Sequence, residues 1–316
     1  MNASTDFLAA DFLAADWGTS NLRAWRLGAD GAVKDVARLP WGVAGLQPGE
    51  AARKLNEELR PRLGAETLPA ILCGMIGSAM GIAEASYADC PAGAQDIAQR
   101  LLQTDERTFI VPGLRCTRPD GYPDVIRGEE TKVLGWLRLD PRRAQGDHVL
   151  CLPGTHAKWV RVRDGRIRDF LTCMSGELYA LLSEKSVLKP GAPPSDSAAF
   201  EEGLRYGAAD APLASRLFTV RARRVGPDPA ERLEPGKAAS FLSGLLIGDE
   251  TARLPQLLGL AEGSSIGLMG ERGLCELYAP ALSLRGLTVD EADAEQAVIA
   301  GLASLMGARP QKGALA

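Results

Sequence analysis

The sequence predicts a duplicated α/β protein, and two stretches that repeat one pattern carry this prediction. In the first, the apolar run FLAAD (12–16) leads into the turn WGTS, the run NLRAWRL, the turn GADG and the run AVKDVARL. In the second, HVLCL (148–152) leads into PGTH, KWVRVR, DG and RIRDFLT. Each stretch predicts three strands joined by tight turns, with Gly-Thr at the first turn.

Helical spacing of apolar residues fills much of the rest of the chain, at 51–63, 96–103, 128–139, 175–188, 237–258 and 292–307. The charged, Pro- and Gly-rich stretch 221–237 predicts a surface loop. We place a domain boundary near Gly146, between residues 1–146 and residues 147–316. The last helix is expected to pack back on the N-terminal domain.

The pentapeptide FLAAD occurs twice in tandem, at 7–11 and 12–16, and only the second copy precedes the Gly-Thr turn. Asp16 is therefore the functional copy of the two aspartates that end the repeats. Residues 1–11 are predicted to form a flexible extension outside the domain.

Composition excludes several classes of protein. The 316 residues carry 36 basic and 40 acidic side chains, a net charge of −4, so no basic surface for nucleic acid or for an anionic membrane is expected. The six cysteines are dispersed and there are two histidines, which argues against a zinc site and for a reducing compartment. No apolar run reaches membrane length. We predict a cytoplasmic protein and leave a homodimer open.

Small and hydroxyl residues at the two Gly-Thr turns predict phosphate binding, because such turns expose backbone N–H groups. A carboxylate at the mouth of the first turn can hold Mg²⁺, and an arginine on the next strand can contact phosphate oxygens. The candidate residues of the first turn are Asp16, Gly18, Thr19, Ser20 and Arg23. Those of the second turn are Gly154, Thr155 and His156. No catalytic partner for His156 is evident in the sequence.

The motif D-x-G-T-S-x-x-R (16–23) resembles the first phosphate-binding motif of the superfamily of sugar kinases, chaperone ATPases and actin, and LPGTHAKW resembles the second. Five blocks, CGMIGSAMGIAEASYADCPAG, DVIRGEETKVLG, CLPGTHAKWV, LTCMSGELYALL and LSGLLIGDE, follow in an order that resembles the 2-dehydro-3-deoxygalactonokinase family. The resemblance implies duplicated actin-like, ribonuclease H-like ATPase domains with an interdomain cleft, and MgATP as co-substrate. It also implies that residues 1–146 hold the first phosphate-binding motif and bind the sugar, and that residues 147–316 bind the nucleotide.

The same resemblance implies phosphorylation of 2-dehydro-3-deoxy-D-galactonate at its C6 hydroxyl, in galactonate breakdown. Ile82 stands where the family pattern has Trp, which keeps open a kinase for a different keto-deoxy sugar acid. A phosphohydrolase of the exopolyphosphatase type and a non-enzymatic nucleotide-driven scaffold are further alternatives. The sequence contains neither GxxxxGK[ST] nor GxGxxG, which argues against P-loop and dinucleotide-binding proteins.

Phosphoryl transfer to a hydroxyl needs a proton acceptor, usually a carboxylate. In RGEE we expect Glu129 to be this base and Arg127 to bind the substrate carboxylate, although acidic residues at a helix N-terminus are favourable without any function. Glu130 and Asp249 are the rival bases. Ser78 and Tyr87 are expected to contact substrate, or else to form a turn and part of the core. Gly270, in GLMGERGL, would let the nucleotide approach the backbone.

Overall fold

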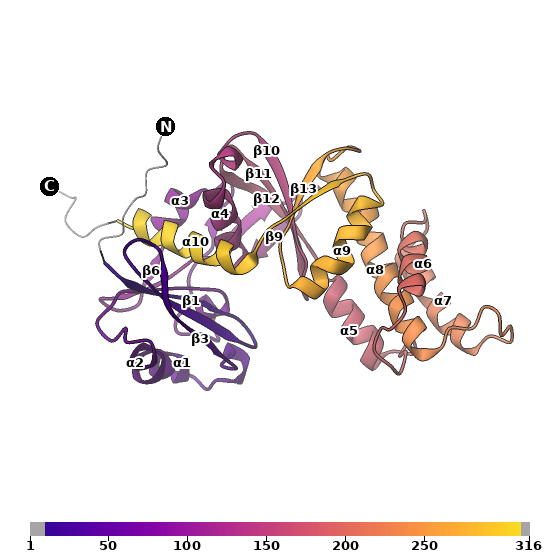
Figure 1. Cartoon of the computed structure of the whole chain (residues 1–316), viewed down its shortest axis with the longest axis horizontal. Coiled ribbons are helices and arrows are strands. Elements are labelled where there is room, and N and C mark those ends of the chain that lie inside the picture. Colours follow the sequence, from indigo (N-terminus) through magenta and orange to yellow (C-terminus); the bar gives the residue numbers. More distant parts are fainter. Residues whose placement is uncertain (1–9, 311–316) are drawn as a thin grey trace. The chain divides into compact units, whose positions relative to one another are not determined.

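The structure is a computed structural model that describes residues 10–310 (Figure 1). The chain divides into two compact units. The first contains the described residues up to His148, Val160–Phe170 and the described residues from Ala292 onward; the second contains Val149–Trp159 and Leu171–Glu291. Of the extension predicted over 1–11, residues 1–9 lie outside the described part. The carboxylate of Asp11 accepts a hydrogen bond from Lys34 Nζ at 2.9 Å.

A six-stranded sheet in the order β3-β2-β1-β4-β7-β6 forms the framework of the first unit. β1 is antiparallel to β2 and parallel to β4, which in turn is parallel to β7. The apolar run of β1 is almost entirely buried, as expected for a strand in the middle of a sheet. The strands are β1 (Phe12–Trp17), β2 (Leu22–Leu27), β3 (Val33–Leu39), β4 (Ala70–Cys73), β6 (Leu102–Gln103) and β7 (Thr108–Ile110).

A second sheet repeats the strand order of the first, as β12-β11-β10-β13-β14. Its two parallel pairs, β10 with β13 and β13 with β14, correspond to β1 with β4 and β4 with β7. The predicted duplicated α/β fold is therefore confirmed at the level of topology. The strands are β10 (Asp147–Leu152), β11 (Ala157–Arg163), β12 (Arg166–Cys173), β13 (Ser265–Leu268) and β14 (Thr288–Glu291).

A three-stranded sheet of β5 (Ala88–Asp89), β8 (Leu114–Thr117) and β9 (Pro123–Ile126) completes the strands of the first unit. Its helices are α1 (Glu50–Arg53), a π-helical segment (Lys54–Leu59), α2 (Arg60–Arg62), α3 (Ala94–Ala98), α4 (Glu129–Leu139) and α10 (Ala294–Ala308). Those of the second unit are α5 (Ser175–Lys185), α6 (Ser197–Gly207), α7 (Leu213–Val225), α8 (Pro235–Leu257) and α9 (Arg272–Ser283). No helix within 10–310 is long and apolar enough to cross a membrane.

Two sequence-based element boundaries are wrong. The helix expected over 96–103 ends at Ala98, because Leu102 and Gln103 pair with β7 as β6. The loop expected over 221–237 begins only after Val225, since residues 221–225 complete α7, where buried Val220 packs against α8.

The C-terminal helix α10 lies beside α4 in the first unit (Figure 1). Close approach of the two backbones depends on glycine: a Cβ atom at Gly135 would lie 1.6 Å from the carbonyl oxygen of Ala297, and one at Gly301 would lie 2.0 Å from that of Thr131. The end of the chain thus buttresses the helix that begins at Glu129.

Replacing Gly135 by Ala is expected to destabilise the first unit by roughly 3 kcal/mol, because backbone atoms cannot turn aside for the added methyl group. The measurement is the free energy of unfolding from urea titration. Gly273→Ala in α9 is the matched control: nothing lies within 4 Å of its Cβ position, so a small stabilisation is expected. Equal stability changes in the two variants would contradict the tight α4–α10 contact.

Candidate active site

Asp16 lies at the carboxyl end of β1, where β1 is flanked by Arg23 of β2 and by Cys73 at the end of β4. Carboxyl ends of adjacent parallel strands are the usual place for ligands in α/β sheets. The side chain of Asp16 is 19% exposed. The site of the first unit is built around this carboxylate.

The Gly18–Asn21 turn directly follows Asp16. It is closed by a 2.9 Å hydrogen bond from Gly18 N to Asn21 O, and it exposes Thr19 and Ser20. Gly42 supports it from behind, since a Cβ atom there would lie 2.1 Å from the carbonyl oxygen of Thr19. The hydroxyl-bearing turn is therefore held in place while its outer face stays accessible.

The N-terminus of α4 lies close to the Asp16 carboxylate. Two glycines in left-handed conformations, Gly74 (φ +91°) and Gly128 (φ +108°), allow this close approach. A Cβ atom at Gly74 would lie 3.2 Å from Asp16 Oδ1, and one at Gly128 would lie 3.1 Å from the Cα of Gly74. Side chains at either position would force the three segments apart. The sequence RGEE is thereby brought close to Asp16, which precedes the first Gly-Thr turn.

Lys132 is a residue of this site that sequence reasoning missed. Its Nζ lies 4.0 Å from Asp16 Oδ2, and its side chain is 30% exposed. Burial lowers the pKa of Lys132, but the carboxylates of Asp16 and Glu129 outweigh burial, so the pKa is raised and the amine stays charged. Lys132 follows Glu129 by three residues, the spacing that places two side chains on one helix face, and this spacing could have revealed it.

The two glutamates of RGEE have different environments. Glu129 is partly exposed, and its Oε2 accepts a hydrogen bond from the backbone N of Arg127 at 3.1 Å. Glu130 is fully buried and accepts hydrogen bonds from Gly128 N at 2.6 Å and from the Thr131 hydroxyl at 3.0 Å. Burial, helped by the charge of Glu129, raises the pKa of Glu130 to about 7. Glu130 thus anchors the turn, whereas Glu129 is the accessible carboxylate.

The raised pKa of Glu130 makes stability depend on pH. The folded state keeps the proton up to about pH 7, whereas the unfolded state releases it near the ordinary value of 4.5, so stability falls as pH rises between these values. Glu130→Gln, which retains an acceptor for Gly128 N, should gain up to about 3 kcal/mol over the wild type between pH 4.5 and 8. Urea unfolding across this range measures the gain, and a difference independent of pH would contradict it.

Arg127 is held beside Tyr87. Its Cζ lies 4.5 Å from the Tyr87 ring centroid, and its Nη2 donates to Ala85 O at 2.8 Å. Its Nη1 is buried and has no hydrogen-bond partner among the described residues. An unsatisfied buried N–H of a charged group is costly, so this donor remains available to an acceptor that the described residues do not supply.

Ser78 and Ile82 take structural positions in the same unit. The Ser78 hydroxyl donates to Met75 O at 2.7 Å and accepts from Met80 N at 3.3 Å, closing a turn. Ile82 packs against the hydrophobic core under the first sheet.

The second Gly-Thr turn lies in the other unit, at Gly154–His156. The N-terminus of α5 packs against it: Glu177 N donates to Thr155 O at 2.9 Å, and a Cβ atom at Gly176 would lie 2.5 Å from Gly154 O. His156 Nε2 is hydrogen-bonded to the Glu177 carboxylate. The partner for His156 that the sequence did not reveal is 21 residues away along the chain.

Gly270 and Glu250 complete this part of the second unit. A Cβ atom at Gly270 would lie 3.1 Å from Pro153 O, immediately before the turn. The buried Glu250 carboxylate accepts hydrogen bonds from Trp159 Nε1 at 2.6 Å, from Tyr278 Oη at 3.0 Å and from the Ser175 hydroxyl. Glu250 therefore ties the first residue of α5 to β11 and α9, and thereby supports the second turn.

Asp249, a rival base, is engaged elsewhere in the second unit. Its carboxylate pairs with the guanidinium of buried Arg216 at 2.5 Å and with Arg253 at 3.0 Å. These two ion pairs favour a structural role.

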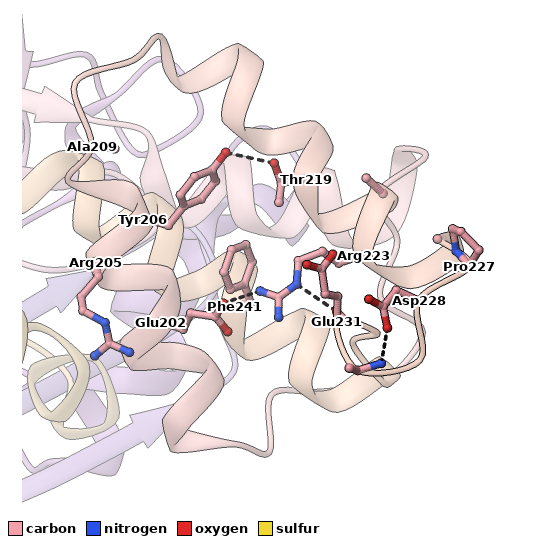
Figure 2. A pocket seen from close by; sticks show the side chains of 13 residues that line it. Glu202, Arg205, Tyr206, Ala209, Thr219, Arg223, Pro227, Asp228, Glu231 and Phe241 are labelled. Atoms are coloured by element: carbon pink, nitrogen blue, oxygen red, sulfur yellow. Dashed lines mark hydrogen bonds and ion pairs between the residues drawn. The ribbon is translucent and has the colours of Figure 1, made fainter.

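A pocket of about 800 Å³ between α6, α7 and α8 contains none of the predicted site residues. Figure 2 shows Arg223 over Phe241 with its ion pair to Glu202, and the Tyr206 hydroxyl on Thr219. These four polar side chains of the pocket, Arg223 with Glu202 and Tyr206 with Thr219, are therefore bound to one another.

Comparison with known proteins identifies the family. The model of the 2-keto-3-deoxy-galactonokinase family matches residues 16–305. A probable 2-dehydro-3-deoxygalactonokinase of Rhizobium meliloti (strain 1021) is 37% identical over 305 residues, which cover 94% of this chain and 96% of that protein. The 2-dehydro-3-deoxygalactonokinase of Escherichia coli (strain K12) is 34% identical over 301 residues, covering 94% and 98%.

A solved structure agrees. The crystal structure of a Sinorhizobium meliloti protein described as a 2-dehydro-3-deoxygalactonokinase superposes with a TM-score of 0.80 at 36% identity, covering 93% of this chain and 97% of that one. The match runs through both units and both Gly-Thr turns, and it confirms the predicted sugar-acid kinase. The chain belongs to the 2-keto-3-deoxy-galactonokinase family.

Proposed function

We propose that this chain transfers the γ-phosphoryl group of ATP to the C6 hydroxyl of 2-dehydro-3-deoxy-D-galactonate, giving the 6-phosphate and ADP in galactonate breakdown. The observation that carries the proposal is the convergence of Asp16, Lys132 and Glu129 beside an exposed Gly-Thr-Ser turn. Membership of the kinase family supports the reaction class. We place the enzyme in the cytoplasm, in keeping with six cysteines that form no disulfide bond within residues 10–310.

In the proposed mechanism Glu129 accepts the proton of the C6 hydroxyl. The C6 oxygen then forms a bond to the γ-phosphorus, the bond from that phosphorus to the β–γ bridging oxygen breaks, and ADP leaves. Arg23 and Lys132 offset the negative charge of the phosphoryl oxygens, and the Thr19 and Ser20 hydroxyls orient them. In the second unit, Gly154, Thr155 and His156 would bind phosphate, and Gly270 would lie by the nucleotide.

Mg²⁺ fits the donor set of the first turn. Mg²⁺ is usually bound by one or two carboxylates, here Asp16, together with phosphate oxygens and water. Within residues 10–310 there is no group of three or more His, Cys, Asp or Glu side chains that could hold a metal ion. Bound by Asp16, Mg²⁺ would neutralise charge on the phosphates.

Arg127 is proposed to bind the substrate carboxylate. Arg127→Lys keeps the charge but loses the planar pair of donors, so the KM for the sugar acid should rise about 10–100-fold, with little change in the KM for ATP. Initial-rate kinetics with each substrate varied measure both constants. Arg115→Lys, at an exposed ion pair with Asp89, is the control. An unchanged KM for the sugar acid in Arg127→Lys would reject this role.

The experiment that tests the proposed substrate is a coupled ADP-release assay with MgATP and a panel of 2-keto-3-deoxy sugar acids. We expect the highest kcat/KM with the galactonate-derived acid. A higher value with an epimer would reassign the substrate, and ADP release without any sugar acid would indicate a phosphohydrolase.

A further inference from the structure

A hollow of about 680 Å³ in the first unit is walled by arginines and shares no residue with the candidate active site. It lies between the β11–β12 hairpin and the loop that follows β8. Its guanidinium groups belong to Arg118, Arg161, Arg163, Arg166 and Arg168. The predicted reaction assigns it no role.

The strand pattern explains why four of these arginines gather on one face. In β11 the residues Val160 and Val162 are buried and alternate with Arg161 and Arg163, and in β12 buried Ile167 separates Arg166 from Arg168. Because successive side chains of a strand point to opposite faces, one face of the hairpin is apolar and the other is basic. The wall of the hollow is therefore built into the rigid part of the hairpin.

The lining has an excess of positive charge. Five arginines face two aspartates, which leaves 5 − 2 = +3 in a chain whose net charge is −4. Both aspartates are engaged: Asp164 accepts from Gly146 N at 3.0 Å, and Asp169 binds Arg161 through both oxygens at 2.7 and 2.5 Å. The two acidic residues of the lining therefore do not by themselves balance its five guanidinium groups.

The remaining arginines also form ion pairs but keep donors available. Arg163 pairs with Asp147, Arg166 with Asp96 and Arg118 with Asp120, all outside the lining, and Arg168 Nε lies 3.6 Å from Asp169 Oδ2 within it. Each guanidinium has five N–H donors, and the side chains of Arg163, Arg166 and Arg168 are 53%, 46% and 48% exposed. Arg118 Nε is buried with no hydrogen-bond partner among the described residues.

We propose that this hollow binds a small polyanion that carries at least two phosphate or carboxylate groups. Planar guanidinium groups bind such oxygens in pairs, and several arginines on one rigid face match separated anionic groups of one molecule. The volume suits a metabolite rather than a single ion. The site stands independently of the proposed kinase reaction.

The test is calorimetric titration of the full chain with inorganic tripolyphosphate at low salt. The double variant Arg163→Ala/Arg168→Ala lacks two exposed guanidinium groups of the hollow. Its affinity for tripolyphosphate should be at least tenfold lower than that of the wild type. Arg142→Ala/Arg272→Ala, at positions 90% and 92% exposed, removes the same charge outside the hollow and should bind as the wild type does. Equal affinities in all three chains, or no saturable binding by the wild type, would overturn the proposal.

Two further arms separate the ligand sources and the two sites. Competition by 6-phosphogluconate but not by ATP would assign the hollow to a phosphorylated sugar acid, and the reverse would assign it to a nucleotide. If neither 6-phosphogluconate nor ATP competes with tripolyphosphate, the proposal of a metabolite site is overturned and the hollow binds only the probe. Asp16→Asn should retain the tripolyphosphate binding that Arg163→Ala/Arg168→Ala loses; loss in Asp16→Asn alone would place the binding at the phosphate turn instead.

Discussion

Asp16→Asn should lower the rate of ADP formation roughly 10³-fold, the size of effect typical of a lost electrostatic group in an active site. The substitution keeps the shape of the side chain and removes its charge. The charge matters because Asp16 precedes the Gly-Thr-Ser turn, faces Lys132 at 4.0 Å and is the carboxylate that would hold Mg²⁺. Steady-state ADP release with saturating sugar acid measures the loss.

Asp11→Asn is the matched control, since Asp11 ends the first copy of the same pentapeptide, FLAAD. Its carboxylate pairs with half-exposed Lys34, so its loss should change stability little and leave turnover near the wild-type rate. Similar losses of turnover in the two variants would show that Asp16 has no special role.

Glu129→Gln should lower kcat by about 10²–10⁴-fold, the usual contribution of a general base, while both KM values change little. Glu130→Gln, one residue away, should retain most of the activity because the amide oxygen can still accept from Gly128 N. Stopped-flow or coupled kinetics of the two variants at several pH values supply the comparison.

The pair of variants also separates catalysis from helix capping. If Glu129 only capped α4, its neutral variant would lose stability rather than kcat. A large loss of kcat in Glu130→Gln, with Glu129→Gln near the wild type, would transfer the role of base to the buried carboxylate.

The repeated hairpins could be predicted from sequence because their signals are local: apolar runs, Gly-Thr turns and Asp-Gly turns occur within 30 residues of one another. The candidate site residues within these motifs could be predicted from the sequence for the same reason. The prediction was wrong at Leu102 and Gln103, where pairing with β7 overrides helical spacing.

Residues that depend on tertiary contacts were missed. The spacing from Glu129 places Lys132 on the same helix face, but the contact with Asp16 depends on the left-handed glycines Gly74 and Gly128, which bring α4 to that carboxylate. His156 and its partner Glu177 are 21 residues apart along the chain. Glu250 and its donor Trp159 are 91 residues apart. No sequence period links such positions, so only the fold reveals them.

The most direct test of the proposed reaction is the ³¹P NMR spectrum of a mixture of the enzyme, MgATP and 2-dehydro-3-deoxy-D-galactonate. We predict ADP together with a phosphomonoester whose phosphorus couples to the two protons on C6. Inorganic phosphate in place of the ester, or an ester on another carbon, would contradict the proposal that Glu129 activates the C6 hydroxyl beside the Asp16 turn.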